Sequence, residues 1–166
     1  MGDNNCMEAY LDIETTGLSA CYHQITVVGI AVGDARRQDV VQLVGRDVTR
    51  RNLLRALEGV RTLYTYNGSR FDLPFLTSWL GIDLLTFLSH RDLMLDCWSQ
   101  NLYGGLKKVE QRLGIARRLA DINGYDAVRL WMRYVDYRDQ DALLTLLEYN
   151  KEDVLNLKVL KERLLG

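Results

Sequence analysis

Four acidic side chains lie in three short stretches of the sequence whose surroundings are otherwise apolar. Asp12 and Glu14 fall in the run LDIETTGL, Asp72 in YNGSRFDLPFL and Asp153 in YNKEDVLNL. Carboxylates held together in a partly buried site repel one another and lose hydration, so they need protons, ion pairs or bound cations. The four acids therefore predict a divalent-metal site, and such sites commonly carry out phosphate chemistry.

The spacing of these acids indicates which elements position them. Asp12 and Glu14 are two residues apart in a strand-like run, so both side chains point to one face of a sheet. Asp153 interrupts the apolar stripe of a helix, and Tyr149 precedes it by one turn. Two alternatives remain open at this point. Asp153 could pair with a core-facing arginine, and Asp72 could cap the helix that begins near Pro74.

Hydrophobic periodicity predicts an α/β fold with a mixed sheet of about five strands. Short helices are expected at residues 51–57 and 73–80, and the chain after the fifth strand is helical in pattern with glycine breaks. A polar turn is expected around Asp34 to Gln38. The expected strands cover residues 9–13, 25–32, 40–44 and 61–66, with a fifth near 86–93.

Composition sets modest limits on the class of protein. A chain of 166 residues with 48% hydrophobic and 26% charged residues is expected to form a single soluble domain over residues 1–166. The net charge of −1 shows no global basic field, although an acidic site can hide local basic patches in the sum. The three cysteines are widely spaced, which argues against zinc and suits a reducing cytoplasm. We expect no signal peptide, because the start MGDNNC has neither a basic n-region nor an apolar h-region. We expect no membrane partner, because the longest mainly apolar run, Ile25 to Val32, is too short to span a bilayer.

The three acidic stretches together resemble the exonuclease motifs of the DEDD superfamily. The nearest resemblance is to YprB-type RNase H-like domains and to the exonuclease domain of family B DNA polymerases. HRDLMLDCW followed by GLKKVEQRLGI is also similar to the middle of the YprB-type domains. The resemblance runs from about Ala9 to Leu164, and it implies an RNase H-like fold with helices on both faces of the sheet.

The third motif distinguishes two branches of that superfamily, and this chain resembles the tyrosine branch. Neither His23 nor His90 lies at the distance before Asp153 that the histidine branch requires, whereas Tyr149 and Asp153 form Y-x-x-x-D. Tyr137 and Asp141 form the same pattern. Asp141 lies at the start of the last helical run, where an acid is explained by capping and by the helix dipole. We therefore favour Tyr149 and Asp153.

The resemblance implies a role for each residue of the motifs. Asp12 would bridge two Mg²⁺ or Mn²⁺ ions about 3.5–4 Å apart. Glu14 and Asp153 would complete the shell of the first ion, Asp72 would hold the second, and Tyr149 would orient the attacking water.

Four further residues are candidates for contact with the substrate. Phe71 could stack on a terminal base or pack in the core, and Leu18 could wedge beside that base or be buried. Asn67 is the third candidate. Lys107 belongs to a basic stretch that could follow phosphates, although a solvated helix face is the default interpretation. That stretch consists of Lys107, Lys108, Arg112, Arg117 and Arg118. For His90 and Asp92 a structural role is favoured.

The expected function is metal-dependent 3′–5′ hydrolysis of nucleic acid, with single-stranded or frayed DNA as the first choice and RNA left open. Two alternatives come from other classes. The chain could be a module that binds nucleic acid on a nuclease fold without cutting it. It could also be a phosphodiesterase for very short oligonucleotides, an alternative that the nearly neutral charge and the small size of the chain leave open.

Overall fold

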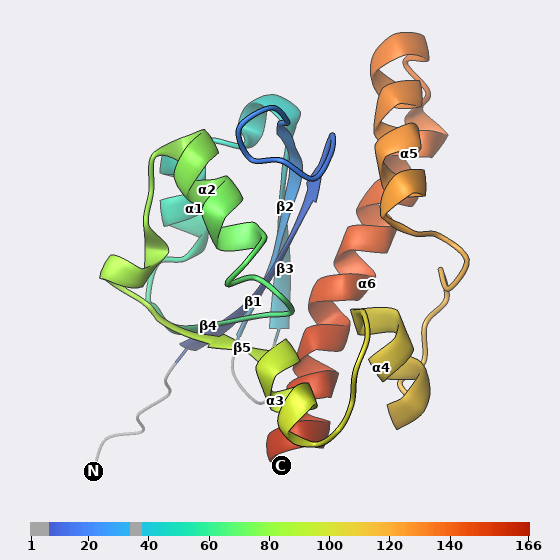
Figure 1. The fold of residues 1–166 in the computed structure, drawn as a ribbon. Coiled ribbons are helices and arrows are strands. Elements are labelled where there is room, and N and C mark those ends of the chain that lie inside the picture. The colour runs from blue at the N-terminus through green and yellow to red at the C-terminus, as the bar shows by residue number, and fades with distance from the viewer. Residues whose placement is uncertain (1–6, 34–37) are drawn as a thin grey trace.

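The computed structural model describes residues 7–33 and 38–166. Its centre is a mixed sheet of five strands in the order β3-β2-β1-β4-β5 (Figure 1). β1 pairs with β2 antiparallel and with β4 in parallel, β2 pairs with β3 antiparallel, and β4 pairs with β5 in parallel. The strands are β1 (Met7–Thr15), β2 (Ile25–Gly33), β3 (Gln38–Val44), β4 (Val60–Thr65) and β5 (Ser89–Asp92). The predicted α/β class and mixed sheet are confirmed.

The strand positions differ from the expected ones mainly at their ends. The turn expected around Asp34 to Gln38 lies outside the described residues except for Gln38, which begins β3. The fifth strand starts at Ser89, because residues 84–86 form the 3-10 turn η2 (Leu84–Thr86) and Asp83 caps it by accepting from the Leu85 N–H. Short, mostly polar strands such as β5 lack the alternation that marks the ends of longer ones.

Helices cover both faces of the sheet, as the resemblance implied (Figure 1). One face packs against α1 (Arg50–Ala56) and α2 (Asp72–Leu80), where Ala9, Leu11 and Ile13 of β1 join a large apolar cluster. The other face carries the remaining helices. These are α3 (Leu93–Ser99), α4 (Leu106–Leu113), α5 (Gly124–Tyr137) and α6 (Gln140–Leu165).

The two-residue period of β1 decides what each face receives. Ala9, Leu11 and Ile13 point to the face covered by α1 and α2, whereas Tyr10, Asp12 and Glu14 point to the face covered by α6. The predicted common face of Asp12 and Glu14 is thus confirmed. The acids lie on this face between two apolar clusters. In one, Tyr10 packs with Val154, Leu157 and Leu160 of α6, and in the other Val27 of β2 packs with Leu146 of α6.

The 26-residue helix α6 crosses this face of the sheet and carries the expected buried stripe. Asp139 caps its start by accepting a hydrogen bond from the Ala142 N–H, as an N-cap acid does. Asp153 lies in the buried stripe, and Tyr149 is buried one turn earlier. Within the described part of the chain, no helix combines the length and apolar character that crossing a membrane would require.

Candidate metal centre

Asp12 is held in place by an amide of α6 that approaches the sheet closely. Asn150, fully buried, donates from Nδ2 to the backbone oxygen of Asp12 at 3.2 Å and to its Oδ2 at 3.1 Å. Gln42 of β3 donates to Asn150 Oδ1 at 2.9 Å. Gly29 lies directly across from Asp12 on β2 and leaves room for this amide, because a Cβ there would come within 2.1 Å of Asn150 Oδ1.

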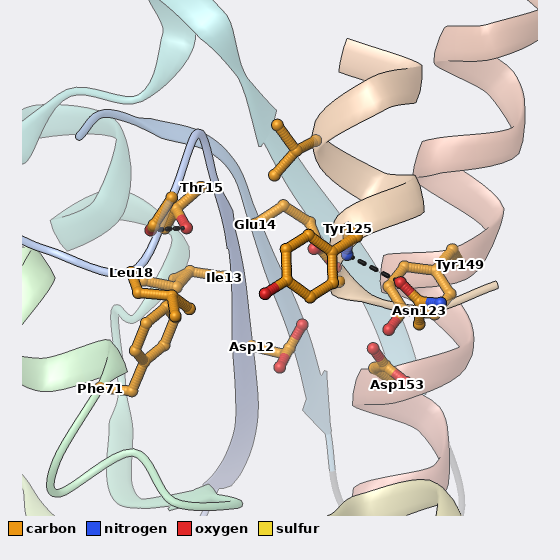
Figure 2. A pocket seen from close by; sticks show the side chains of 13 residues that line it. Asp12, Ile13, Glu14, Thr15, Leu18, Phe71, Asn123, Tyr125, Tyr149 and Asp153 are labelled. Carbon is orange, nitrogen blue, oxygen red and sulfur yellow. Dashed lines mark hydrogen bonds between the residues drawn. The ribbon is translucent and has the colours of Figure 1, made fainter. Parts of the chain in front are cut away.

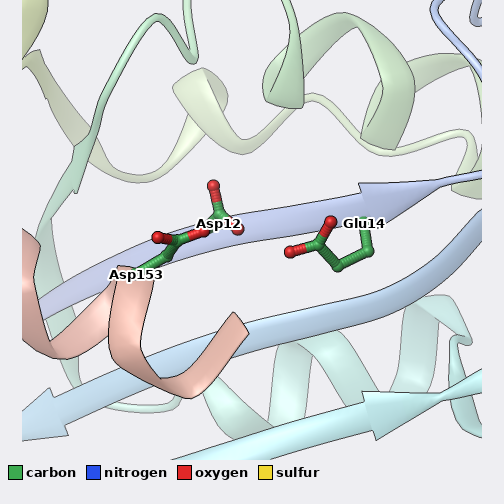
Figure 3. Close-up of side chains that lie close together, drawn as sticks. All are labelled: Asp12, Glu14 and Asp153. Atoms are coloured by element: carbon green, nitrogen blue, oxygen red, sulfur yellow. The ribbon is translucent and has the colours of Figure 1, made fainter. Parts of the chain in front are cut away.

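Three of the four predicted acids form one cluster (Figure 3). Asp12 and Glu14 from β1 and Asp153 from α6 each offer a carboxylate oxygen, and these atoms lie within 4.8 Å of one another. Burial raises the pKa of Asp12 and of Glu14 well above the ordinary values, and the Asp153 carboxylate adds to both shifts. Oε1 of Glu14 is buried and has no hydrogen-bond partner among the described residues.

The fourth acid, Asp72, lies beside this cluster rather than within it. Its Oδ1 accepts a hydrogen bond of 3.1 Å from the backbone N–H of Ile13, between the two acids of β1. β4 has stopped pairing with β1 by this point, since the last matched pair is Tyr10 with Tyr64. Asp72 is in the first turn of α2, whose N-cap is Phe71, so Asp72 is not the capping residue. Burial raises its pKa to about 7.

The turn before Asp72 is fixed by Asp92. The Asp92 carboxylate accepts from the Asn67 N–H at 2.7 Å, and from the Ser69 N–H and hydroxyl at 3.1 and 2.7 Å. It also caps α3 by accepting from the Met94 N–H at 3.1 Å. His90 bonds the Thr65 hydroxyl through Nε2 at 2.9 Å. These contacts are all structural, in line with the role favoured for His90 and Asp92.

Asp153 has a second partner, which the sequence left as an alternative. Arg117, with a side chain only 5% exposed, pairs with Asp153 and at 2.7 Å with Glu110. Glu110 is itself buried and accepts from Asn156 Nδ2 at 3.0 Å. The solvated helix face expected for the basic stretch is therefore wrong for Arg117. Burial raises the pKa of Asp153 to about 6 even though Arg117 opposes this shift.

Tyr149 shares the cavity of the acids and is covered by two cations. Lys107 Nζ lies 5.0 Å from the centre of its ring, and the Arg117 guanidinium carbon lies 5.8 Å from it. Burial raises the pKa of the Tyr149 hydroxyl above its ordinary value, so this hydroxyl keeps its proton at neutral pH and can donate. The competing pair, Tyr137 and Asp141, is exposed.

A cavity of about 480 Å³ opens over the acids (Figure 2). Asp12, Glu14, Asp153 and Tyr149 line it. Leu18, which follows β1, and Phe71, which precedes α2, form one wall. The start of α5 forms the other wall, through Asn123, Gly124, Tyr125 and Val128.

Of the four predicted substrate-contact residues, two line the cavity and two do not. Leu18 is 82% exposed, and Phe71 lines the cavity while also packing on Phe75 with ring centres 4.9 Å apart. Asn67 and Lys107 are not among the residues that line the cavity. Lys107 instead donates to the Ala120 carbonyl at 3.2 Å, beside Tyr149.

Sequence reasoning missed Arg117, Tyr125 and Asn150. Arg117 belongs to a stretch of basic residues in which nothing distinguishes it from its neighbours, and no sequence motif surrounds Tyr125. Asn150 is the one with a partial signal, because it stands next to Tyr149 in the sequence. Its approach to Gly29 is seen only in the structure.

The donor set fits a hard divalent cation. Carboxylate oxygens are the ligands that Mg²⁺ and Mn²⁺ prefer. The clustered acids have pKa values raised by burial and mutual repulsion, and one oxygen of Glu14 has no hydrogen-bond partner in the described part of the chain, as expected of a ligand atom.

Comparison with known proteins identifies the fold of this arrangement. A family model described as RNase_H superfamily matches residues 9–165. No curated protein matches the chain significantly. The family B DNA polymerase of the archaeon Pyrobaculum calidifontis has a similar structure, with a TM-score of 0.70 at 19% identity. That match covers 96% of this chain but only 24% of the polymerase, so the chain spans about a quarter of its length.

NrnC of Brucella melitensis is a second structural neighbour. In complex with pGG it gives a TM-score of 0.63 at 24% identity, covering 98% of this chain and 74% of NrnC. With bound Mg²⁺ it gives 0.62 at 23% identity, with the same coverage. At such identities these likenesses describe the shared fold.

Proposed function

Because the chain belongs to the RNase H superfamily, we propose that it is a metal-dependent 3′–5′ exonuclease of the tyrosine DEDD branch. Its substrate is the end of a single-stranded or frayed nucleic acid, with DNA as the first choice. One observation carries the proposal. Three carboxylates from β1 and α6, far apart in the sequence, converge within 4.8 Å at the floor of an open cavity, and Tyr149 stands beside them.

Asp12, Glu14, Asp72 and Asp153 would hold two divalent cations, Mg²⁺ or Mn²⁺. Such ions supply a hydroxide nucleophile at neutral pH and neutralise the leaving oxygen of a phosphodiester. The fit of the cluster supports this assignment, because its acids are otherwise costly to keep ionised together. Asp72 would contribute to metal binding from its position next to the three-acid cluster, where it accepts a hydrogen bond from the Ile13 N–H.

The other residues of the chain orient and balance these acids. Asn150 fixes the rotation of the Asp12 carboxylate by donating to its Oδ2. Arg117 offsets part of the negative charge at Asp153. Tyr149 retains its proton at neutral pH, so its hydroxyl donates a hydrogen bond and positions a water molecule rather than acting as a base.

A phosphodiesterase for very short oligonucleotides is the second candidate. Two observations favour it: the cavity is only about 480 Å³, and no lysine or arginine of the described residues lines it. A long strand would need cations along its backbone. The NrnC structure bound to pGG belongs to a protein of the same fold.

The assay that tests the proposal uses purified chain, Mn²⁺ or Mg²⁺, and 5′-labelled substrates. These are single-stranded DNA, blunt duplex DNA, single-stranded RNA and a dinucleotide. We expect a ladder of 5′-labelled products that shortens from the 3′ end on single strands, and none with Asp12→Ala. Immediate release of a labelled mononucleotide from a long strand would contradict the polarity.

Two other outcomes decide between the candidates. Cleavage of the dinucleotide alone would favour the phosphodiesterase. An uncut but tightly bound strand, in the presence of a metal that raises the melting temperature, would favour a module that binds without cutting.

A further inference from the structure

Two large apolar side chains stand in solvent on opposite walls of the cavity (Figure 2). Tyr125 of α5 is 81% exposed, and Leu18 of the loop after β1 is 82% exposed. Single exposed apolar residues are ordinary on protein surfaces. Among the exposed large apolar side chains of the described residues, however, these are the two that line the cavity over the acids.

Both side chains are presented by backbone that is held firmly. Tyr125 lies in the first turn of α5, where the Asn123 side chain accepts from the N–H groups of Tyr125 and Asp126. Asp126 returns a bond to the Asn123 N–H at 3.0 Å, which completes a capping box.

The opposite loop is similarly closed. Thr16 donates from its N–H to the Gln24 carbonyl at 2.9 Å, and the Thr15 hydroxyl donates to the Gly17 carbonyl at 2.6 Å. The His23 ring fills the space beside Gly17, where a Cβ would come within 2.4 Å of it. The two walls are thus a preformed slot, because neither needs to be ordered when a ligand enters.

The chemistry of the slot selects its ligand. Its floor carries Asp12, Glu14 and Asp153, and its walls are mostly apolar, with Asn123 and Thr15 as polar members. None of the described lysines and arginines lines it, so an anionic group reaches the floor only where cations neutralise the acids. The walls by contrast suit a flat, uncharged ring. A nucleobase joined to a phosphate has both parts, and aromatic side chains stack on any base because each has a π-face.

We propose that Tyr125 stacks on the base of the terminal nucleotide, with Leu18 against the other side of the slot. This inference rests on the proposed function and adds a substrate-positioning residue on α5 to it. A base held between the two walls must leave its partner strand, so the slot selects an unpaired end. Tyr125 acts by its ring and not by its hydroxyl.

The test compares Tyr125→Ala, Tyr125→Phe and a matched control, Tyr137→Ala. Tyr137 is on the same helix and is also 81% exposed, but it does not line the cavity. The probe is a short single-stranded oligothymidylate with 2-aminopurine as its 3′ nucleotide, because weakly stacking thymine neighbours leave its fluorescence largely unquenched until the base stacks on the protein. Binding is measured with Ca²⁺, with the length of the probe verified by electrophoresis. A hairpin with a blunt, paired 2-aminopurine end serves as the second probe.

We expect Tyr125→Ala to weaken binding of the single strand about fivefold to a hundredfold, in line with the usual worth of one stacked base. The fluorescence quench disappears with it, and in steady-state cleavage with Mn²⁺ KM rises while kcat changes little. Tyr125→Phe and Tyr137→Ala behave as wild type. The hairpin binds weakly and equally to all four proteins. An unchanged rise of melting temperature with Mn²⁺ verifies that the acid site of Tyr125→Ala is intact.

Each contrary outcome has a distinct meaning. If Tyr125→Ala binds and quenches the single strand as wild type does, the stacking role is wrong and the exonuclease proposal stands. If the hairpin binds wild type as tightly as the single strand, the end is not splayed and the inference is overturned. If wild type neither binds nor quenches the single strand, the proposed function fails and the inference with it.

Discussion

Asp153 has two partners of opposite kind. It faces two carboxylates of β1 on one side and the guanidinium of Arg117 on the other. The sequence presented a metal site and an arginine partner as competing explanations for one acid in an apolar stripe, and the structure places both the acid cluster and Arg117 beside Asp153. Arg117 also holds the buried Glu110 through two hydrogen bonds of 2.7 and 2.9 Å, so it joins α4 to α6 beneath the cluster.

Arg117 is therefore expected to matter for stability. Arg117→Gln leaves Glu110 buried without its cation, and losing one partner of a buried pair typically costs about 3–5 kcal/mol. We expect a loss of that size in the free energy of unfolding, measured by urea titration. Arg118→Gln is the control, because Arg118 is 83% exposed and its pair with Glu148 should be worth about 1 kcal/mol or less. Equal urea midpoints for the two variants would contradict the structural role of Arg117.

Substitutions of the acids and of Tyr149 should separate metal binding from water positioning. Asp12→Ala and Asp153→Ala remove ligands of the proposed ions, so activity should fall to background. Tyr149→Phe keeps the ring and removes the donor, and we expect a loss in rate of about 10²- to 10⁴-fold. Nuclease rates on one labelled strand provide the measurement.

The competing Y-x-x-x-D pair supplies matched controls for these substitutions. Tyr137→Phe and Asp141→Ala change exposed residues and should keep wild-type rates. Full activity of a folded Asp153→Ala would falsify the assignment of the third motif.

At the scale of elements, the site depends on how closely α6 approaches β2. The Asn150 amide occupies the space over Gly29 and reaches Asp12 from there. A side chain at position 29 would push the helix away from the strand that carries two of the acids.

Gly29→Ala should therefore damage both stability and activity. The added Cβ would lie 2.1 Å from Asn150 Oδ1, and overpacking of this kind costs about 1–3 kcal/mol. The nuclease rate should fall as well, because Asp12 loses its orienting donor. Gly105→Ala is the control for thermal melting, since a Cβ there meets nothing within 4 Å and the backbone is extended. A Gly29→Ala protein as stable and active as Gly105→Ala would show that the approach is not needed.

The elements that sequence could predict are those whose hydrophobic pattern extends over many residues. β2 was visible as a continuous apolar run, β1 as a strand-like run, and the α6 stripe because its helical spacing repeats. That repetition also favoured Tyr149 over Tyr137. The start of β5 was missed because a capped 3-10 turn precedes a strand of four residues. Arg117 and Tyr125 were missed because their surroundings are set by tertiary packing between α4, α5 and α6, which no local pattern records.

For the molecule as a whole, the acidic site opposes folding when no cation is bound. The folded protein raises the pKa of Asp72 from an ordinary 3.8 to about 7 and that of Asp153 to about 6. The folded state therefore holds protons that the unfolded chain has already released. Between about pH 4 and 7 this makes the unfolded state increasingly favoured as pH rises.

Melting temperatures in EDTA should accordingly fall as pH rises through that window, and Asp72→Asn should flatten the fall. Mn²⁺ should reverse the trend, because ions replace the protons and bind best when the acids are ionised. At 100 times the dissociation constant, a ligand specific for the folded state adds about 2.7 kcal/mol. Melting curves recorded across pH with EDTA and with Mn²⁺ provide the measurement. Identical curves under both conditions would argue against a metal site.

Because the site is built from β1 and α6, which are far apart in the sequence, it can form only late in synthesis and folding. During synthesis Asp12 and Glu14 leave the ribosome early, and Asp153 follows Asp12 by 141 residues. Asn150, which orients Asp12, follows Asp12 by 138 residues. Contacts between such distant parts of a chain form late in folding, after the local ones. A growing chain that has already paired β1, β2 and β3 thus carries two acids but neither Asp153 nor the helix that completes the centre. The centre is assembled only when α6 docks, so nascent and truncated chains are expected to be inert.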